Sequence, residues 1–61
     1  MYHIYFKAYE VGTTHLVDDV EHMSSVEYMR QFLYELLCDE TVREIYISDD
    51  SGQIFLQYRR A

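Results

Sequence analysis

A single segment with helical periodicity, residues 25–38, divides this chain into two parts that both show the alternation of β-strands. Before it, residues 2–9 are rich in β-forming side chains that alternate with period two. After it, residues 42–58 contain two alternating runs joined by Asp49-Asp50-Ser51-Gly52, a sequence typical of a tight turn. The pattern therefore predicts a β-hairpin after the helix.

A second hairpin is predicted before the helix. Residues 11–14 contain Gly12 and are typical of a turn, and the weaker alternating run at residues 14–20 can pair with residues 2–9. We therefore predict a small two-layer α+β fold of order β-β-α-β-β, in which one helix packs on one face of an antiparallel sheet. The 61 residues form one domain, residues 1–61. A chain of this length buries only roughly 60% of its unfolded surface, so its core is marginal.

The helical segment carries a start signal and an apolar stripe. Ser24 and Glu27 have the spacing of a capping box, in which each side chain satisfies a backbone N–H of the first turn. Asp39 and Glu40 follow the last turn, where the helix dipole favours cations, and this indicates that they already belong to the connecting turn. The residues predicted to face the core are Val26, Met29, Phe32, Leu33, Leu36 and Leu37.

The strands predict an aromatic face that the helix does not cover. Ile45 and Ile47, and likewise Ile54, Leu56 and Tyr58, form apolar sets that should face the helix. Side chains on a strand alternate between the two faces, so the opposite face receives Tyr5, Tyr9, Tyr46 and Phe55. Such a face is consistent with cross-strand aromatic pairing within one molecule, with a homodimer interface, or with a different partner.

No arrangement of residues typical of catalysis is present. The three histidines, His3, His15 and His22, match no zinc spacing, and Cys38 is the only cysteine. The chain also lacks a glycine-rich phosphate loop and a dinucleotide fingerprint. We therefore expect a protein that is not an enzyme, with no catalytic residues, no cofactor and no metal.

Charge restricts the classes of partner. Eleven acidic residues against five basic ones give a net charge of −6, which disfavours direct binding to nucleic acid and to anionic membranes. No apolar run approaches the roughly 20 residues of a membrane span. A single cysteine suits a reducing compartment, so a cytoplasmic location is expected.

The acidic residues are also clustered, and this leads to the functional hypothesis. In size and net charge, the chain is similar to small inhibitors made by phages and mobile elements. Such inhibitors occupy the nucleic-acid-binding sites of enzymes. We therefore expect an inhibitor of a nucleic-acid-processing protein that mimics DNA, with a homodimeric accessory module as the alternative. The residues expected to contact the basic partner are Asp18, Asp19, Glu21, Asp39, Glu40, Glu44, Asp49 and Asp50.

Overall fold

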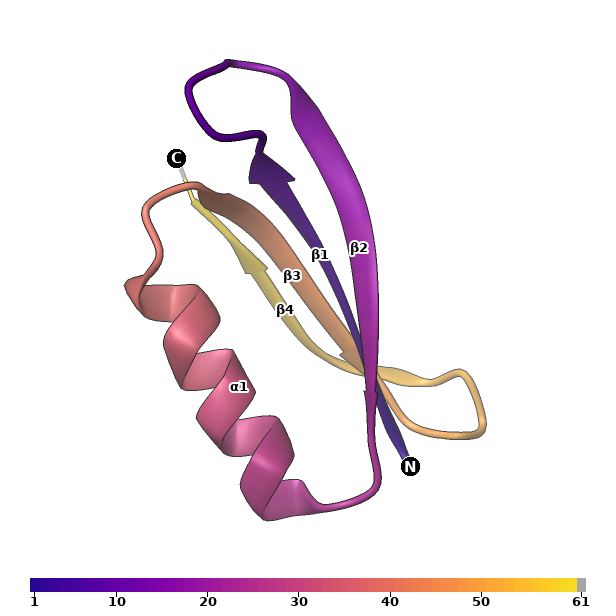
Figure 1. Cartoon of the computed structure of the whole chain (residues 1–61). Helices are drawn as coiled ribbons and strands as arrows, with labels where there is room; N and C mark the ends of the chain where they lie inside the picture. Colours follow the sequence, from indigo (N-terminus) through magenta and orange to yellow (C-terminus); the bar gives the residue numbers. More distant parts are fainter. Residues whose placement is uncertain (61) are drawn as a thin grey trace.

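A computed structural model describes residues 1–60 of the chain and has the predicted element order (Figure 1). Strands β1 (Tyr2–Tyr9) and β2 (Leu16–Met23) precede helix α1 (Val26–Cys38), and strands β3 (Val42–Ser48) and β4 (Ile54–Arg59) follow it. All neighbouring strands are antiparallel, in the order β2-β1-β3-β4. The predicted α+β fold is therefore confirmed, and the sheet places β1 beside β3 at its centre.

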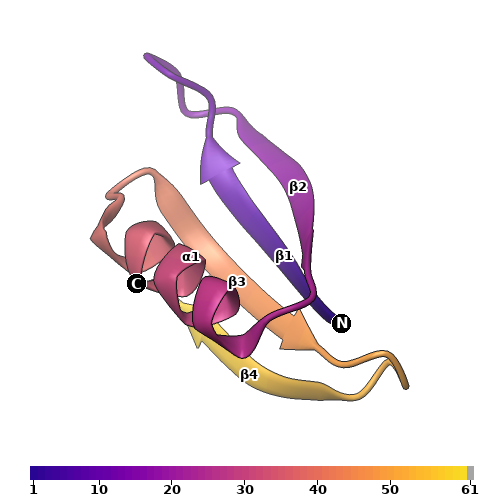
Figure 2. The same cartoon turned by 60° about the horizontal axis from the view of Figure 1, so that its bottom comes forward.

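The core lies between α1 and one face of the sheet (Figure 2). From β1 it receives Ile4, which is fully buried, and its neighbours Tyr2, Phe6 and Ala8 pack against the same cluster. The predicted alternation of β1 is thereby confirmed. The buried apolar residues of the described chain are Ile4, Met29, Leu36, Val42, Ile45 and Ile47.

The start of α1 differs from the predicted capping box by one residue. Ser25, not Ser24, is the N-cap: its backbone is extended, and its Oγ accepts a hydrogen bond from the Glu27 N–H at 3.1 Å. Strand β2 continues to Met23, which leaves only a two-residue link before the helix. The link consists of Ser24 and Ser25, and Ser25, the residue next to the helix, caps it.

The predicted apolar stripe of α1 is wider than the face that is buried. Met29 and Leu36 are buried, and Phe32 and Leu33 pack against the core, as predicted. Val26 and Leu37, in contrast, are exposed. They lie in the first and last turns of the helix, where the small sheet does not cover both flanks of the stripe.

Two irregularities shift the register of the strand pairs. One lies between Lys7 and Ala8 where β1 pairs with β3, and the other lies between Ile47 and Ser48 where β3 pairs with β4. Because of the second shift, Ile54 pairs with Ser48 and is 48% exposed. Our prediction that Ile54 belongs to the buried set with Leu56 and Tyr58 was therefore wrong.

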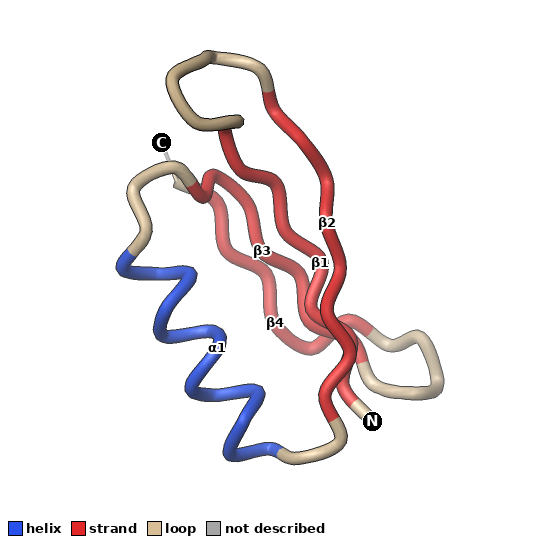
Figure 3. The backbone as a smooth tube through the Cα atoms, in the orientation of Figure 1, coloured by secondary structure: helices blue, strands red, loops and turns tan. Residues whose placement is uncertain are grey.

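The predicted turns are both present at the ends of the hairpins (Figure 3). In the β3–β4 turn, Gly52 has a φ of 85°, and its N–H donates to the Asp49 carbonyl oxygen at 3.1 Å. Glycine adopts such a φ without strain because it has no Cβ. Asp49 stabilises the same turn through its side chain, because its Oδ1 accepts the backbone N–H groups of Ser51 and Gln53.

Candidate functional site

The face of the sheet opposite α1, here called the open face, is crossed by a row of alternating charges. Asp18 of β2 pairs in register with Lys7 of β1, Lys7 pairs with Glu44 of β3, and Glu44 pairs with Arg59 of β4. Residues paired in register share a face, so these four side chains, the charged row, lie on one line across all four strands.

Within the charged row, the ion pair between β3 and β4 is shorter than the ion pair between β1 and β2. The Arg59 guanidinium donates to Glu44 Oε1 at 3.1 Å, and the Lys7 Nζ lies 4.0 Å from Asp18 Oδ1. Glu44 also accepts a hydrogen bond from the Tyr46 hydroxyl at 2.7 Å. This hydroxyl, followed by the Arg59 guanidinium, holds the pKa of Glu44 below its ordinary value. Asp18 remains highly exposed, with 79% of its side chain accessible.

The aromatic residues expected on this face are separated by the fold. Tyr5 and Tyr46 are paired in register next to the charged row. Tyr9 lies further along β1, with the Arg43 guanidinium 5.5 Å from its ring centroid. Phe55 lies at the irregularity of β4 and packs edge-on against Tyr2, with 5.9 Å between the ring centroids. The central aromatic pair is therefore Tyr5 and Tyr46, and Phe55 belongs to a different contact.

Several of the acids expected to bind a partner also make hydrogen bonds within the molecule. Asp39 Oδ1 accepts from the Thr41 hydroxyl and N–H, and these bonds lower the pKa of Asp39. Hydrogen bonds from Ser51 lower the pKa of Asp49 in the same way. Asp50 is bonded to the N-terminal ammonium at 2.9 Å, which lowers its pKa. Together with Glu44, these carboxylates stabilise turns and strand pairs.

Three exposed acids with few side-chain contacts lie together on β2, an edge strand. Asp18, Asp19 and Glu21, here called the acidic edge, are all exposed. Asp19 Oδ1 accepts only the neighbouring Val20 N–H. Within residues 1–60, the Glu21 carboxylate makes no hydrogen bond or ion pair. Glu40 is also exposed but lies apart, in the α1–β3 connection. The predicted acidic set thus consists of four acids that hold turns or strand pairs, Glu40 in a connection, and the acidic edge.

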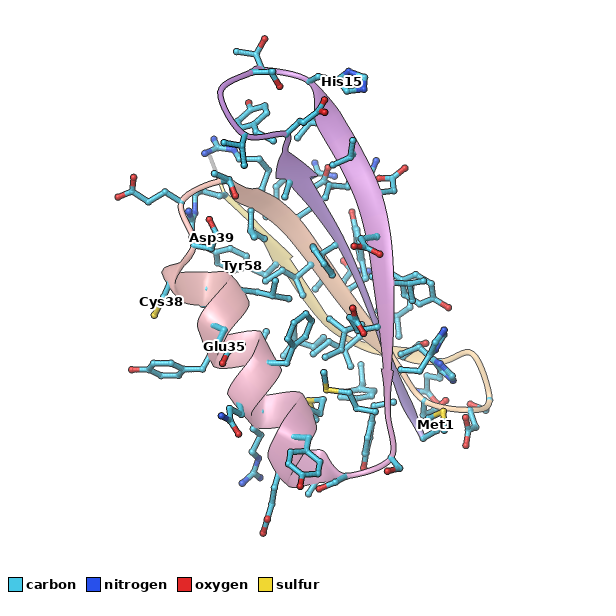
Figure 4. All side chains as sticks on the ribbon, in the orientation of Figure 1. Met1, His15, Glu35, Cys38, Asp39 and Tyr58 are labelled. Atoms are coloured by element: carbon cyan, nitrogen blue, oxygen red, sulfur yellow. The ribbon has the colours of Figure 1, made fainter. Side chains whose placement is uncertain are left out.

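A histidine pair was missed in the sequence. His3 and His22 are paired in register, and their Nδ1 atoms lie 2.7 Å apart, while His3 Nε2 lies 3.0 Å from Asp50 Oδ1. The network ties β1, β2 and the β3–β4 turn together at the end of the sheet where Met1 lies (Figure 4). Aligning residues 2–9 antiparallel with a strand ending at residue 23 would have found the pair, but our predicted strand ended at residue 20.

A shallow groove of about 480 Å³ separates α1 from the end of β2. Its lining includes one imidazole, His22, whose Nδ1 already contacts His3, and one carboxylate, Glu35. Among residues 1–60, no three His, Cys, Asp or Glu side chains gather where they could hold a metal ion. Cys38 is exposed at the end of α1. No helix in the described chain is long and apolar enough to cross a membrane.

Comparison with known proteins adds no relatives. No protein-family model, no curated protein sequence and no solved structure matches this chain.

Proposed function

We propose that this protein is a non-enzymatic interaction module whose acidic edge occupies a basic, nucleic-acid-binding site on a partner protein. The observation that supports the proposal is the location of Asp18, Asp19 and Glu21: exposed, on an edge strand, in a chain of net charge −6. An anionic surface of this kind attracts the basic grooves that normally bind phosphates.

The spacing of the acidic edge supports the comparison with DNA. Successive residues of a strand advance by about 3.4 Å, and phosphates along one DNA strand advance by about the same distance along the helix axis. Asp18 and Asp19 are adjacent and point to opposite faces of β2, while Glu21 lies on the same face as Asp19. An extended strand therefore presents closely spaced carboxylates along one narrow ridge.

The edge position of β2 provides the access that such a ridge requires. One side of β2 pairs with β1, and the other side has no strand beside it in residues 1–60. A basic cleft on a partner can therefore enclose β2 from its free side. The acids that stabilise turns are less available to a partner, because Oδ1 of Asp39 and Oδ1 of Asp49 already accept hydrogen bonds within the chain.

The proposal is tested by affinity capture with matched charge reversals. The wild-type protein is immobilised and exposed to a bacterial lysate at low salt. It should capture a nucleic-acid-binding protein, which high salt or short duplex DNA then releases. The variant D19K/E21K should bind that protein about tenfold more weakly or worse, because repulsion replaces attraction at the proposed contact. The variant spares Asp18, which belongs also to the charged row.

The control is E27K/E35K, which changes the net charge by the same amount on exposed positions of α1. It should retain most of the affinity if the acidic edge, rather than total charge, makes the contact. Equal losses in both variants, or a captured protein that neither salt nor duplex DNA releases, would rule out the proposed site. Circular dichroism of each variant verifies that the fold is intact.

A further inference from the structure

We infer that the open face associates with a second copy of this chain about a two-fold axis that runs along the strands, between β1 and β3. This inference does not depend on the proposed function. It is based on the order of charges in the charged row, which reads acid, base, acid, base from β2 to β4. When this row faces a second copy that runs in the reverse order, every acid lies opposite a base.

A two-fold axis determines which residues of the row face each other across the interface. In a face-to-face pair, an axis along the strands reverses the row, so that Asp18 lies opposite Arg59 of the second copy and Lys7 lies opposite Glu44 of the second copy. Every facing pair then has opposite charges. An axis across the strands that passes through the row would instead place each charged residue opposite itself, and like charges would repel. The charges therefore select the first axis.

The same axis places aromatic side chains at the centre of the interface. Tyr5 and Tyr46 are the inner members of the next row, so Tyr5 lies opposite Tyr46 of the second copy. Tyr5 is 46% exposed, which leaves a substantial part of the residue to be buried. Aromatic residues at the centre are typical of specific interfaces.

The size of the face predicts the strength of the association. Four strands about 4.8 Å apart, with a rise of about 3.3 Å per residue, form a face of about 20 by 25 Å. Two such faces cover roughly 1,000 Å² in total, which lies at the lower end for specific protein interfaces. We therefore expect a dimer that dissociates in the micromolar range and weakens as salt is added.

Complementary charge reversals test the facing pairs directly. In K7E, a glutamate at position 7 faces Glu44 of the second copy; in E44K, a lysine at position 44 faces Lys7 of the second copy. Each variant alone should therefore sediment as a monomer at concentrations where the wild type is a dimer. An equimolar mixture should restore the dimer, because K7E then faces E44K with opposite charges at both pairs. Loss of the dimer in each single variant, followed by its restoration in the mixture, is the result expected when position 7 of one copy faces position 44 of the other.

A second pair of variants keeps the test decisive if a charge reversal unfolds the chain. Y5K places a charge at the centre of the open face and should abolish the dimer, whereas Y34K changes an equally large tyrosine on the exposed side of α1 and should not. A wild type that remains monomeric at about ten times the expected micromolar dissociation constant would overturn the inference. So would a dimer that Y5K leaves intact, or single variants that the mixture fails to rescue.

Discussion

Arg60 supplies the cation that the end of α1 lacks in its own sequence. Its Nη atoms donate to the Leu37 and Asp39 carbonyl oxygens at 2.9 and 3.1 Å. The guanidinium also lies 6.0 Å from the ring centroid of Tyr58. A residue that follows β4 thus satisfies carbonyl groups of the kind that every helix leaves unpaired at its C-terminus.

We expect R60A to destabilise the protein by about 1–2 kcal/mol, because two charge-assisted hydrogen bonds to the helix end are lost. In a domain of this size, each kcal/mol lowers the melting temperature by about 4–8 °C. Thermal unfolding followed by circular dichroism measures the shift. R59A is the matched control: it removes the same charge from an exposed side chain, which is paired with Glu44 on the open face, and should have a smaller effect. Equal shifts would contradict the capping role.

At the scale of the elements, carboxylates hold the connections in place. Asp39 stabilises the α1–β3 connection through Thr41, and Asp49 stabilises the β3–β4 turn through Ser51. Asp50 links that turn to β1 through His3, and Glu44 links β3 to β4. In each case the hydrogen-bonded form is the ionised one, which is why the four pKa values are lowered in the folded chain.

These lowered pKa values predict acid sensitivity. A carboxyl whose pKa is lower in the folded than in the unfolded chain stabilises the fold above its unfolded pKa, and the stabilisation disappears as pH falls through the folded pKa. The melting temperature should therefore begin to fall as pH drops below about 5, and fall steeply below about 4.

The contribution of one turn can be isolated with D49N. The asparagine oxygen can still accept the turn's N–H groups but does not titrate, so this variant should lose less of its stability than the wild type between neutral and acidic pH. Melting curves across the pH series measure both proteins. A wild-type melting temperature that stays constant down to about pH 2.5 would contradict the assigned role of these carboxylates.

At the scale of the whole molecule, stability depends on one small core on one side of the sheet. Ile45 and Ile47 of the central strand β3 are fully buried beneath α1, and Ile4 of β1 lies beside them. The open face contributes no buried apolar cluster among residues 1–60. A domain of this length is only marginally stable, so it depends on this single core.

I45A should therefore leave the chain largely unfolded. Removing a buried isoleucine costs about 2–5 kcal/mol, which is comparable to the total stability of a small domain. I54A is the matched control, because Ile54 is half exposed, and it should cost less than about 1 kcal/mol. Denaturant titration of both variants measures the difference. A folded I45A with near wild-type stability would mean that the core lies elsewhere.

Local sequence patterns were sufficient to predict the element order, the two turns and the faces of β1 and β3. These features follow from local causes: the period of the apolar residues, the turn residues and the conformational freedom of Gly52. The same reasoning misplaced the helix cap by one residue and assigned Ile54 to the core. Both errors arise where neighbouring elements, rather than local preference, set the outcome: the length of β2 and the register shift between β3 and β4.

The availability of the charged residues, by contrast, depends on tertiary contacts. Asp49 and Asp18 are alike in sequence, yet one stabilises a turn and the other is exposed on an edge strand. Strand order and register bring Lys7, Glu44 and Arg59 into one row with Asp18. These contacts join residues far apart in the chain. They depend on how the hairpins pair across β1 and β3, a long-range choice that no local pattern encodes.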